Sequence, residues 1–126
     1  MNLLDTHVLL WMAQEPDRLP ASANAKINSN EPLFLSYASV WEIAIKSGIN
    51  KIDLKWSIRE FVEMAITKHS LQTLSISLRH IYHTQQLPLH HRDPFDRLLI
   101  AQSIVEDIRI ISSDVVFDAY GIKRIW

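Results

Sequence analysis

Cysteine is absent from this chain of 126 residues, and glycine occurs only at Gly48 and Gly121. Without cysteine the chain can form neither a disulfide framework nor a thiolate metal site, and its composition suits a reducing compartment. Both glycines lie at the expected ends of helices, so no glycine-rich loop is present to cradle a phosphate. The P-loop and dinucleotide-binding classes are therefore disfavoured.

A large net charge and a long apolar run are also missing. The 13 basic and 14 acidic residues nearly cancel, so composition gives no broad electrostatic footprint for nucleic acid. No apolar stretch reaches the roughly 18 residues of a membrane span, and the N-terminal MNLLDTHVLLW has no basic leader. We expect a cytoplasmic protein without a membrane partner, folded as a single domain over residues 1–126.

Short apolar runs alternate with helical patterns along most of the chain. Strands are predicted at residues 1–5, 33–36, 71–76, 108–113 and 122–126. Helices are predicted at residues 6–14, 20–28, 37–46, 58–68, 78–87, 94–106 and 115–120, with Thr6, Ser36, Ser57 and Ser77 as N-caps. This alternation favours an α/β domain with a mainly parallel sheet.

Acidic residues follow two of the predicted strands, with Asp5 after the first and Asp114 after the fourth. Open parallel sheets bind ligands beyond the carboxyl ends of their strands. If the two strands are neighbours, both carboxylates project into one crevice. Each acid taken alone is equally well explained as a helix N-terminal residue favoured by the helix dipole.

Glu42 lies on the one narrow polar stripe of the predicted helix 37–46, together with Lys46. Residues four apart on a helix often form an ordinary ion pair, which is one explanation of both side chains. The rest of this helix is apolar, however, so most of its surface should be covered. A carboxylate on such a helix is expected to face a cleft.

Several carboxylates that share one cleft repel one another, and some would take up protons unless a cation is present. Oxygen-only ligand sets suit Mg²⁺ or Mn²⁺. Such ions often share phosphate oxygens with a substrate and activate water as a nucleophile. The acids therefore point to phosphodiester hydrolysis.

The stretch HHRDPFDRLLIAQ, residues 90–102, holds two further aspartates. Pro94 fits the first position of a helix, where its missing N–H is unneeded. Asp93 is then the N-cap, accepting hydrogen bonds from backbone N–H groups. Asp96 falls at the third helical position, from which its carboxylate can project toward the cleft. We assign Asp93 to the helix cap and Asp96 to the metal.

Four segments, LLDTHVLLW, SVWEIAIK, DPFDRLLIAQ and IISSD, with IW closing the chain, resemble the PIN-domain ribonucleases. Within that family the chain is most similar to the toxins of VapBC-type toxin–antitoxin systems. The resemblance implies a PIN-like three-layer α/β sandwich, with helices on both faces of a central parallel five-stranded sheet of order 3-2-1-4-5.

The resemblance also implies an endoribonuclease that depends on Mg²⁺ or Mn²⁺. Asp5, Glu42, Asp96 and Asp114 match the family's four acids, as catalytic and metal-binding residues. Thr6 and Ser112 match supporting hydroxyls beside the first and fourth acids, Ser112 standing where the family often has threonine. The implied partners are an RNA substrate, a cognate antitoxin and a second copy of the chain in a homodimer.

Basic side chains lie close to these acids in the sequence. Lys46, His91, Arg92 and Arg97 could hold RNA phosphates, although a solvated loop explains the last three equally well. His80 and His83 are expected on the surface, because no zinc-site spacing is present. Trp41 and Ile45 form a second apolar stripe on their helix, which favours contact with a partner subunit.

Three other classes compete with this interpretation. A phosphatase with Asp5 as nucleophile usually needs a second aspartate shortly after the first, and DTHVL lacks one. A phospho-acceptor receiver domain needs an acceptor aspartate after a mid-chain strand and a lysine after a later one, and neither is found. The third class is a catalytically silent PIN fold that binds only RNA or protein. It stays an alternative, because the presence of the four acids does not establish catalysis.

Overall fold

The centre of the molecule is a five-stranded, all-parallel sheet with strand order β3-β2-β1-β4-β5. The computed structural model describes residues 1–126. The strands are β1 (Asn2–Leu4), β2 (Leu33–Ser36), β3 (Gln72–Leu74), β4 (Arg109–Ile111) and β5 (Arg124–Ile125). Both the predicted parallel sheet and its predicted strand order are confirmed, although most strands are shorter than their apolar runs.

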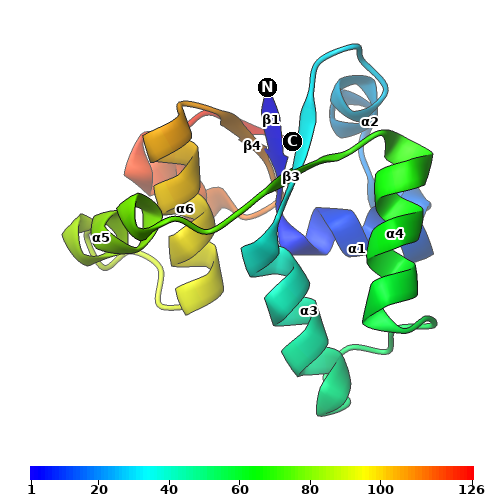
Figure 1. Cartoon of the computed structure of the whole chain (residues 1–126). Coiled ribbons are helices and arrows are strands. Elements are labelled where there is room, and N and C mark those ends of the chain that lie inside the picture. Colours follow the sequence, from blue (N-terminus) through cyan, green and yellow to red (C-terminus); the bar gives the residue numbers. More distant parts are fainter.

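Helices cover both faces of the sheet and complete three layers (Figure 1). On one side lie α1 (Thr6–Gln14), α2 (Ala21–Ile27) and α4 (Ile58–His69), and on the other lie α5 (Leu78–Gln86) and α6 (Pro94–Glu106). Helix α3 (Tyr37–Gly48) follows β2 directly and extends beyond the end of the sheet. Two 3₁₀ helices, η1 (Pro16–Arg18) and η2 (Val115–Tyr120), lie in the connections.

Two hydrophobic cores fill the spaces between the layers, because successive side chains of a strand point to opposite faces. Leu4 and Ile111 belong to the core under α1 and α4. Their neighbours Leu3 and Ile110 belong to the core under α6. This is why consecutive positions of β1 and of β4 are apolar, as expected for a parallel sheet covered on both faces. No helix is both long enough and apolar enough to cross a membrane.

Helix starts follow the predicted caps with one exception. Ser36 accepts a hydrogen bond from the backbone N–H of Ala38, and Ser57 accepts one from Glu60. The prediction that Thr6 caps α1 is wrong. The strand ends at Leu4, so Asp5 takes the extended cap conformation and Thr6 is already helical.

The expectation that His80 of helix α5 lies on the surface is wrong. His80, expected on the surface, is only 1% exposed, whereas the apolar side chains of Leu78 and Tyr82 are 63% and 61% exposed. His80 can be buried because both of its ring nitrogens have hydrogen-bond partners. Nδ1 accepts from the backbone N–H of Ser77, and Nε2 lies 2.9 Å from a carboxylate oxygen of Glu106 on α6.

Candidate metal centre

Four acids from four separate segments meet at one end of the sheet. Asp5 lies between β1 and α1, and Asp114 follows β4. Glu42 is on α3 and Asp96 is in the first turn of α6, both of which begin at this same end (Figure 1). The acids lie beyond the carboxyl ends of adjacent strands, where parallel sheets place their ligands.

Asp5 is the most firmly held of the four acids, and its side chain is buried. One carboxylate oxygen accepts from the backbone N–H of Thr6 at 2.7 Å, and the other accepts from the Ser112 hydroxyl at 2.7 Å. Burial raises the pKa of Asp5 above its usual range, against the lowering effect of the Ser112 hydrogen bond. The protein therefore keeps a carboxylate where its charge is costly.

Hydroxyl groups link Asp5 to its surroundings. The Ser112 oxygen also accepts from the backbone N–H of Asp114 at 3.0 Å, so one side chain contacts two of the acids. Thr6 donates from its hydroxyl to that of Ser39 on α3 at 3.0 Å. Ser39 was not identified from the sequence. The only feature of the sequence that could have indicated Ser39 is its position three residues before Glu42, on the same face of the helix.

Glu42 is 3% exposed, yet one of its carboxylate oxygens has no hydrogen-bond partner. The other oxygen pairs with the Lys46 ammonium, and this hydrogen bond raises the pKa of Lys46. The ion pair expected from spacing is thus formed, but in a covered position. A buried, unpartnered carboxylate oxygen is costly and calls for a ligand.

Asp93 and Asp96 are neighbours with different surroundings. One carboxylate oxygen of Asp93 accepts from the backbone N–H groups of Phe95 at 2.9 Å and Asp96 at 3.1 Å, as an N-cap does. Asp96 makes no such contact with the helix. Burial, followed by the charges of Asp5, Asp93, Glu42 and Asp114, raises the pKa of Asp96 to about 8.

The capping role of Asp93 predicts different effects for two substitutions at this position. Asp93→Ala is expected to lower stability by about 1 kcal/mol, because it removes the cap, whereas Asp93→Asn should retain both cap and most activity. Urea unfolding of the two variants measures the difference. Equal stability of Asp93→Ala and the unchanged chain would show that the cap contributes nothing.

His91 lies among the acids as well. Its Nε2 is 2.9 Å from Asp114 Oδ2 and 3.1 Å from Asp96 Oδ2. From the sequence, His91 was proposed as a residue that could hold RNA phosphates. The loop before α6 brings the ring into the cluster, and no local sequence pattern predicts the course of this loop.

The other two basic residues, Arg92 and Arg97, differ in their surroundings. The two terminal nitrogens of Arg97 donate to the backbone carbonyls of Pro88, His91, Thr84 and Leu87. Arg97 therefore supports the loop before α6. Arg92 is exposed and lines a cavity of about 520 Å³ with Trp41 and Phe95.

The residues present fit a hard divalent cation. Burial and the neighbouring carboxylates raise the pKa of Asp96, and a cation among the acids removes this conflict. The unpartnered oxygen of Glu42 offers a ligand atom that nothing else in the protein uses. All four acids supply oxygen ligands, which Mg²⁺ and Mn²⁺ prefer.

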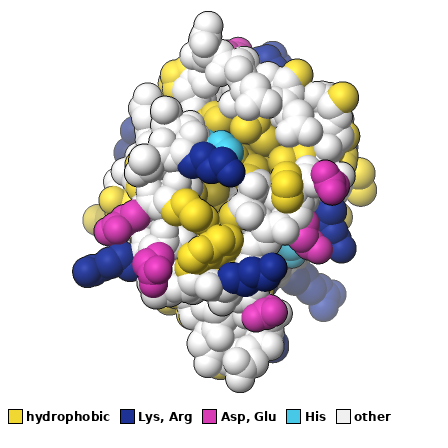
Figure 2. Space-filling model, turned by 90° about the vertical axis from the view of Figure 1, so that its right-hand side faces the viewer, with side chains coloured by type: hydrophobic (Ala, Val, Ile, Leu, Met, Phe, Trp, Pro, Cys, Tyr) yellow, Lys and Arg dark blue, Asp and Glu magenta, His cyan; other side chains and the backbone are white.

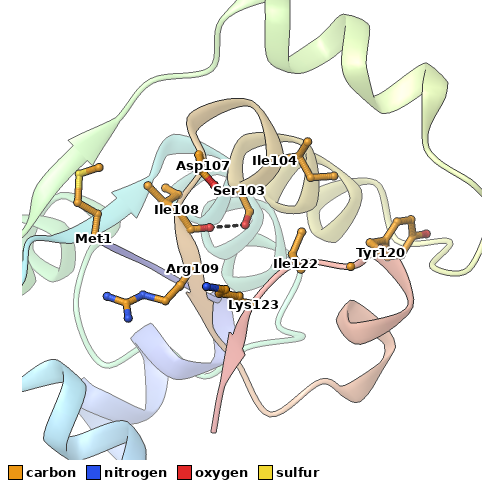
Figure 3. A pocket seen from close by; sticks show the side chains of 10 residues that line it. Met1, Ser103, Ile104, Asp107, Ile108, Arg109, Tyr120, Ile122 and Lys123 are labelled. Atoms are coloured by element: carbon orange, nitrogen blue, oxygen red, sulfur yellow. Dashed lines mark hydrogen bonds between the residues drawn. The ribbon is translucent and has the colours of Figure 1, made fainter.

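A separate cavity of about 570 Å³ lies at the amino ends of β1, β4 and β5, at the other end of the strands from the acids (Figure 3). Met1, Arg109 and Lys123 line it on one side, and Ile104, Tyr120 and Ile122 line it on the other. None of the four acids borders it. The chemistry is therefore concentrated in the acid cluster.

The chain is similar in sequence and in fold to several known proteins. The chain is 28% identical to Ribonuclease VapC22 of Mycobacterium tuberculosis over 113 residues, which are 89% of this chain and 85% of that protein. VapBC2 from Rickettsia felis, solved bound to a DNA fragment from its promoter, aligns with a TM-score of 0.72 and 14% identity over 98% of this chain and 96% of that chain.

DNA-bound VapBC from Salmonella typhimurium aligns with a TM-score of 0.71 and 16% identity, over 98% of this chain and 95% of that chain. At these identities the solved structures establish the fold alone. The family described as PIN domain matches residues 3–123. This match covers nearly the whole chain and the four segments that carry the acids. The chain therefore belongs to the PIN-domain family.

Proposed function

We propose that this chain is an endoribonuclease that depends on Mg²⁺ or Mn²⁺ and hydrolyses RNA phosphodiester bonds. The observation that carries the proposal is the buried, unpartnered oxygen of Glu42 beside three further carboxylates. The likeness to Ribonuclease VapC22 supports RNA as the substrate. Because cellular RNA is the target, we place its action in the cytoplasm.

Asp5, Glu42, Asp96 and Asp114 would hold the cation. A divalent cation at this position activates water and stabilises the charge that develops on a phosphodiester. The protein's part is to fix the ligands before substrate arrives. The Ser112 hydroxyl and the Thr6 backbone N–H both hold the carboxylate of Asp5.

Cations near the crevice would orient the RNA backbone. Lys46 lies beside Glu42, and Arg92 is exposed at the start of α6. Both can donate to phosphate oxygens, which position a nucleic acid without reading its sequence. The donors of His91 and Arg97 are directed to protein atoms, so we give these two residues supporting roles.

Cleavage of a panel of structured RNAs tests this function. We expect cleavage with Mg²⁺ or Mn²⁺, loss of cleavage in excess EDTA, and recovery when the metal is restored. Cleavage that persists undiminished in EDTA would contradict metal dependence. RNA binding without cleavage in either metal would instead support a catalytically silent PIN-fold binding module.

We further propose that the chain is the toxin of a toxin–antitoxin pair. The similar solved structures are described as VapBC and FitAB complexes. A groove between α1 and α4, lined by apolar residues such as Met12, Trp56 and Met64, offers a site for an antitoxin segment. Figure 2 looks onto the side that carries α4 and shows hydrophobic side chains gathered in its middle.

A homodimer is the second proposed assembly. Apolar side chains on α3 and α5 are exposed, with Trp41 at 58% and Tyr82 at 61%. Patches of this kind mark interfaces. Sedimentation at micromolar concentration without antitoxin is expected to give a dimer, and Tyr82→Glu should shift it toward monomer. Arg59→Glu, on the exposed surface of α4, is the matched control. A monomeric unchanged chain would contradict the proposal.

A further inference from the structure

The imidazole of His91 occupies the space between two carboxylates of the acid cluster. Its Nε2 lies 2.9 Å from Asp114 Oδ2 and 3.1 Å from Asp96 Oδ2, and the three atoms are close enough together to surround one ion. In a site for two ions, the second cation would occupy this space between Asp96 and Asp114, because the ions of paired metal sites lie only a few ångströms apart.

Several contacts from separate parts of the chain hold the ring in this place. Nδ1 accepts from the backbone N–H of Asp93 at 3.2 Å, and the ring packs against Phe117 with centroids 5.8 Å apart. The backbone N–H of His91 donates to the Tyr120 hydroxyl at 2.7 Å, and its carbonyl accepts from Arg97 at 3.2 Å. His91 is therefore part of the built site.

The direction of these hydrogen bonds determines what Nε2 can do. Because Nδ1 accepts from a backbone N–H, the ring carries its hydrogen on Nε2. That hydrogen points at Asp96 and Asp114, so Nε2 is a donor. A histidine that binds a metal through one nitrogen normally donates from the other to an acceptor. Here the other nitrogen faces a donor, which disfavours His91 as a metal ligand.

We propose that the N–H of His91 takes the place of a second divalent cation between Asp96 and Asp114, so that the acid cluster binds a single ion. This inference rests on the proposed metal-dependent function. The four acids hold that single ion, with Glu42 supplying its unpartnered oxygen. The His91 N–H lowers the repulsion between the carboxylates of Asp96 and Asp114, as a second cation would.

Counting bound Mn²⁺ tests this inference without measuring activity. The full chain, freed of metal, is titrated with Mn²⁺, and free ion is measured by electron paramagnetic resonance beside calorimetry. We expect one bound ion for the unchanged chain and two for His91→Ala. His91→Gln, whose amide can place an N–H near the position of Nε2, should restore the count to one. His90→Ala, an exposed neighbour, is the matched control and should also bind one.

Each other outcome has one meaning. Absence of Mn²⁺ binding by the unchanged chain would contradict the proposed function itself. Two ions bound to the unchanged chain, or a single ion of equal affinity in His91→Ala, would overturn the role of His91 alone. Loss of Mn²⁺ binding in His91→Ala would also overturn it, since His91 would then be a ligand. Circular dichroism of each variant checks that it is folded.

Discussion

Replacing Asp5 by Asn is expected to lower RNA cleavage by at least about 100-fold and to raise the melting temperature of the metal-free protein. Loss of a metal ligand removes several kcal/mol of transition-state stabilisation, and each 1.4 kcal/mol corresponds to about tenfold in rate. Stability should rise because burial disfavours the charged form of Asp5, whose pKa is raised. Asn carries no charge and caps a helix about as well as Asp.

Cleavage assays with Mn²⁺ and thermal unfolding in EDTA measure the two effects. A gain of about 1 kcal/mol corresponds to about 3 °C for a domain of this size. Asp17→Asn, an exposed residue of η1, is the matched control and should change neither quantity. A marked fall in melting temperature for Asp5→Asn would mean that Asp5 is structural.

A second large effect is expected in how the stability of the metal-free protein depends on pH. Burial and four neighbouring acids raise the pKa of Asp96 to about 8, whereas the unfolded chain has the ordinary value near 3.8. Between these values the folded state holds a proton that the unfolded state has lost. The free energy of unfolding should therefore fall as pH rises through this window, by up to about 1.4 kcal/mol per unit for one proton.

Asp96→Asn is expected to remove this contribution. Urea unfolding in EDTA, repeated from pH 5 to pH 8, compares the variant with the unchanged chain. The readout is the difference between the two curves, which cancels other groups such as His69, whose pKa is lowered by burial. In saturating Mn²⁺, the unfolding free energy of the unchanged chain should lose the fall with pH that Asp96 causes, because the cation replaces the proton on Asp96. If the unfolding free energies of Asp96→Asn and the unchanged chain follow parallel curves against pH in EDTA, the raised pKa of Asp96 is contradicted.

Much of the fold could be predicted because local signals and topology agree. The alternation of strands and helices predicted the parallel sheet, and short polar side chains such as Ser36 and Ser57 marked helix starts. The strand order came from the resemblance, since alternation alone does not determine which strands are neighbours. Asp93 is an N-cap in the structure because Pro94 leaves few other conformations open.

Helix α5 could not be oriented from its sequence. The sequence suggested that His80 is a surface residue, yet His80 is buried and its apolar neighbours Leu78 and Tyr82 are exposed. His80 is buried because Glu106, 26 residues further along, supplies a partner. No local sequence pattern relates these two residues.

The site was predictable where residues follow strands and was missed where contacts are non-local. Asp5 and Asp114 could be placed at the carboxyl end of the sheet from strand positions alone. The bridging position of His91 depends on the path of a loop held by Arg97 and Tyr120. No spacing rule relates these residues, so the sequence suggested only a basic cluster.

The four acids are expected to form a divalent metal site that is completed by the unpartnered oxygen of Glu42. A crystal of the full chain soaked in Mn²⁺, with anomalous scattering recorded from the metal, tests this most directly. We predict an anomalous peak at coordination distance, about 2.0–2.3 Å, from Glu42 Oε1 and from the carboxylates of Asp5 and Asp96. A fully soaked crystal with no peak among these acids, or with peaks only elsewhere on the surface, would contradict the account.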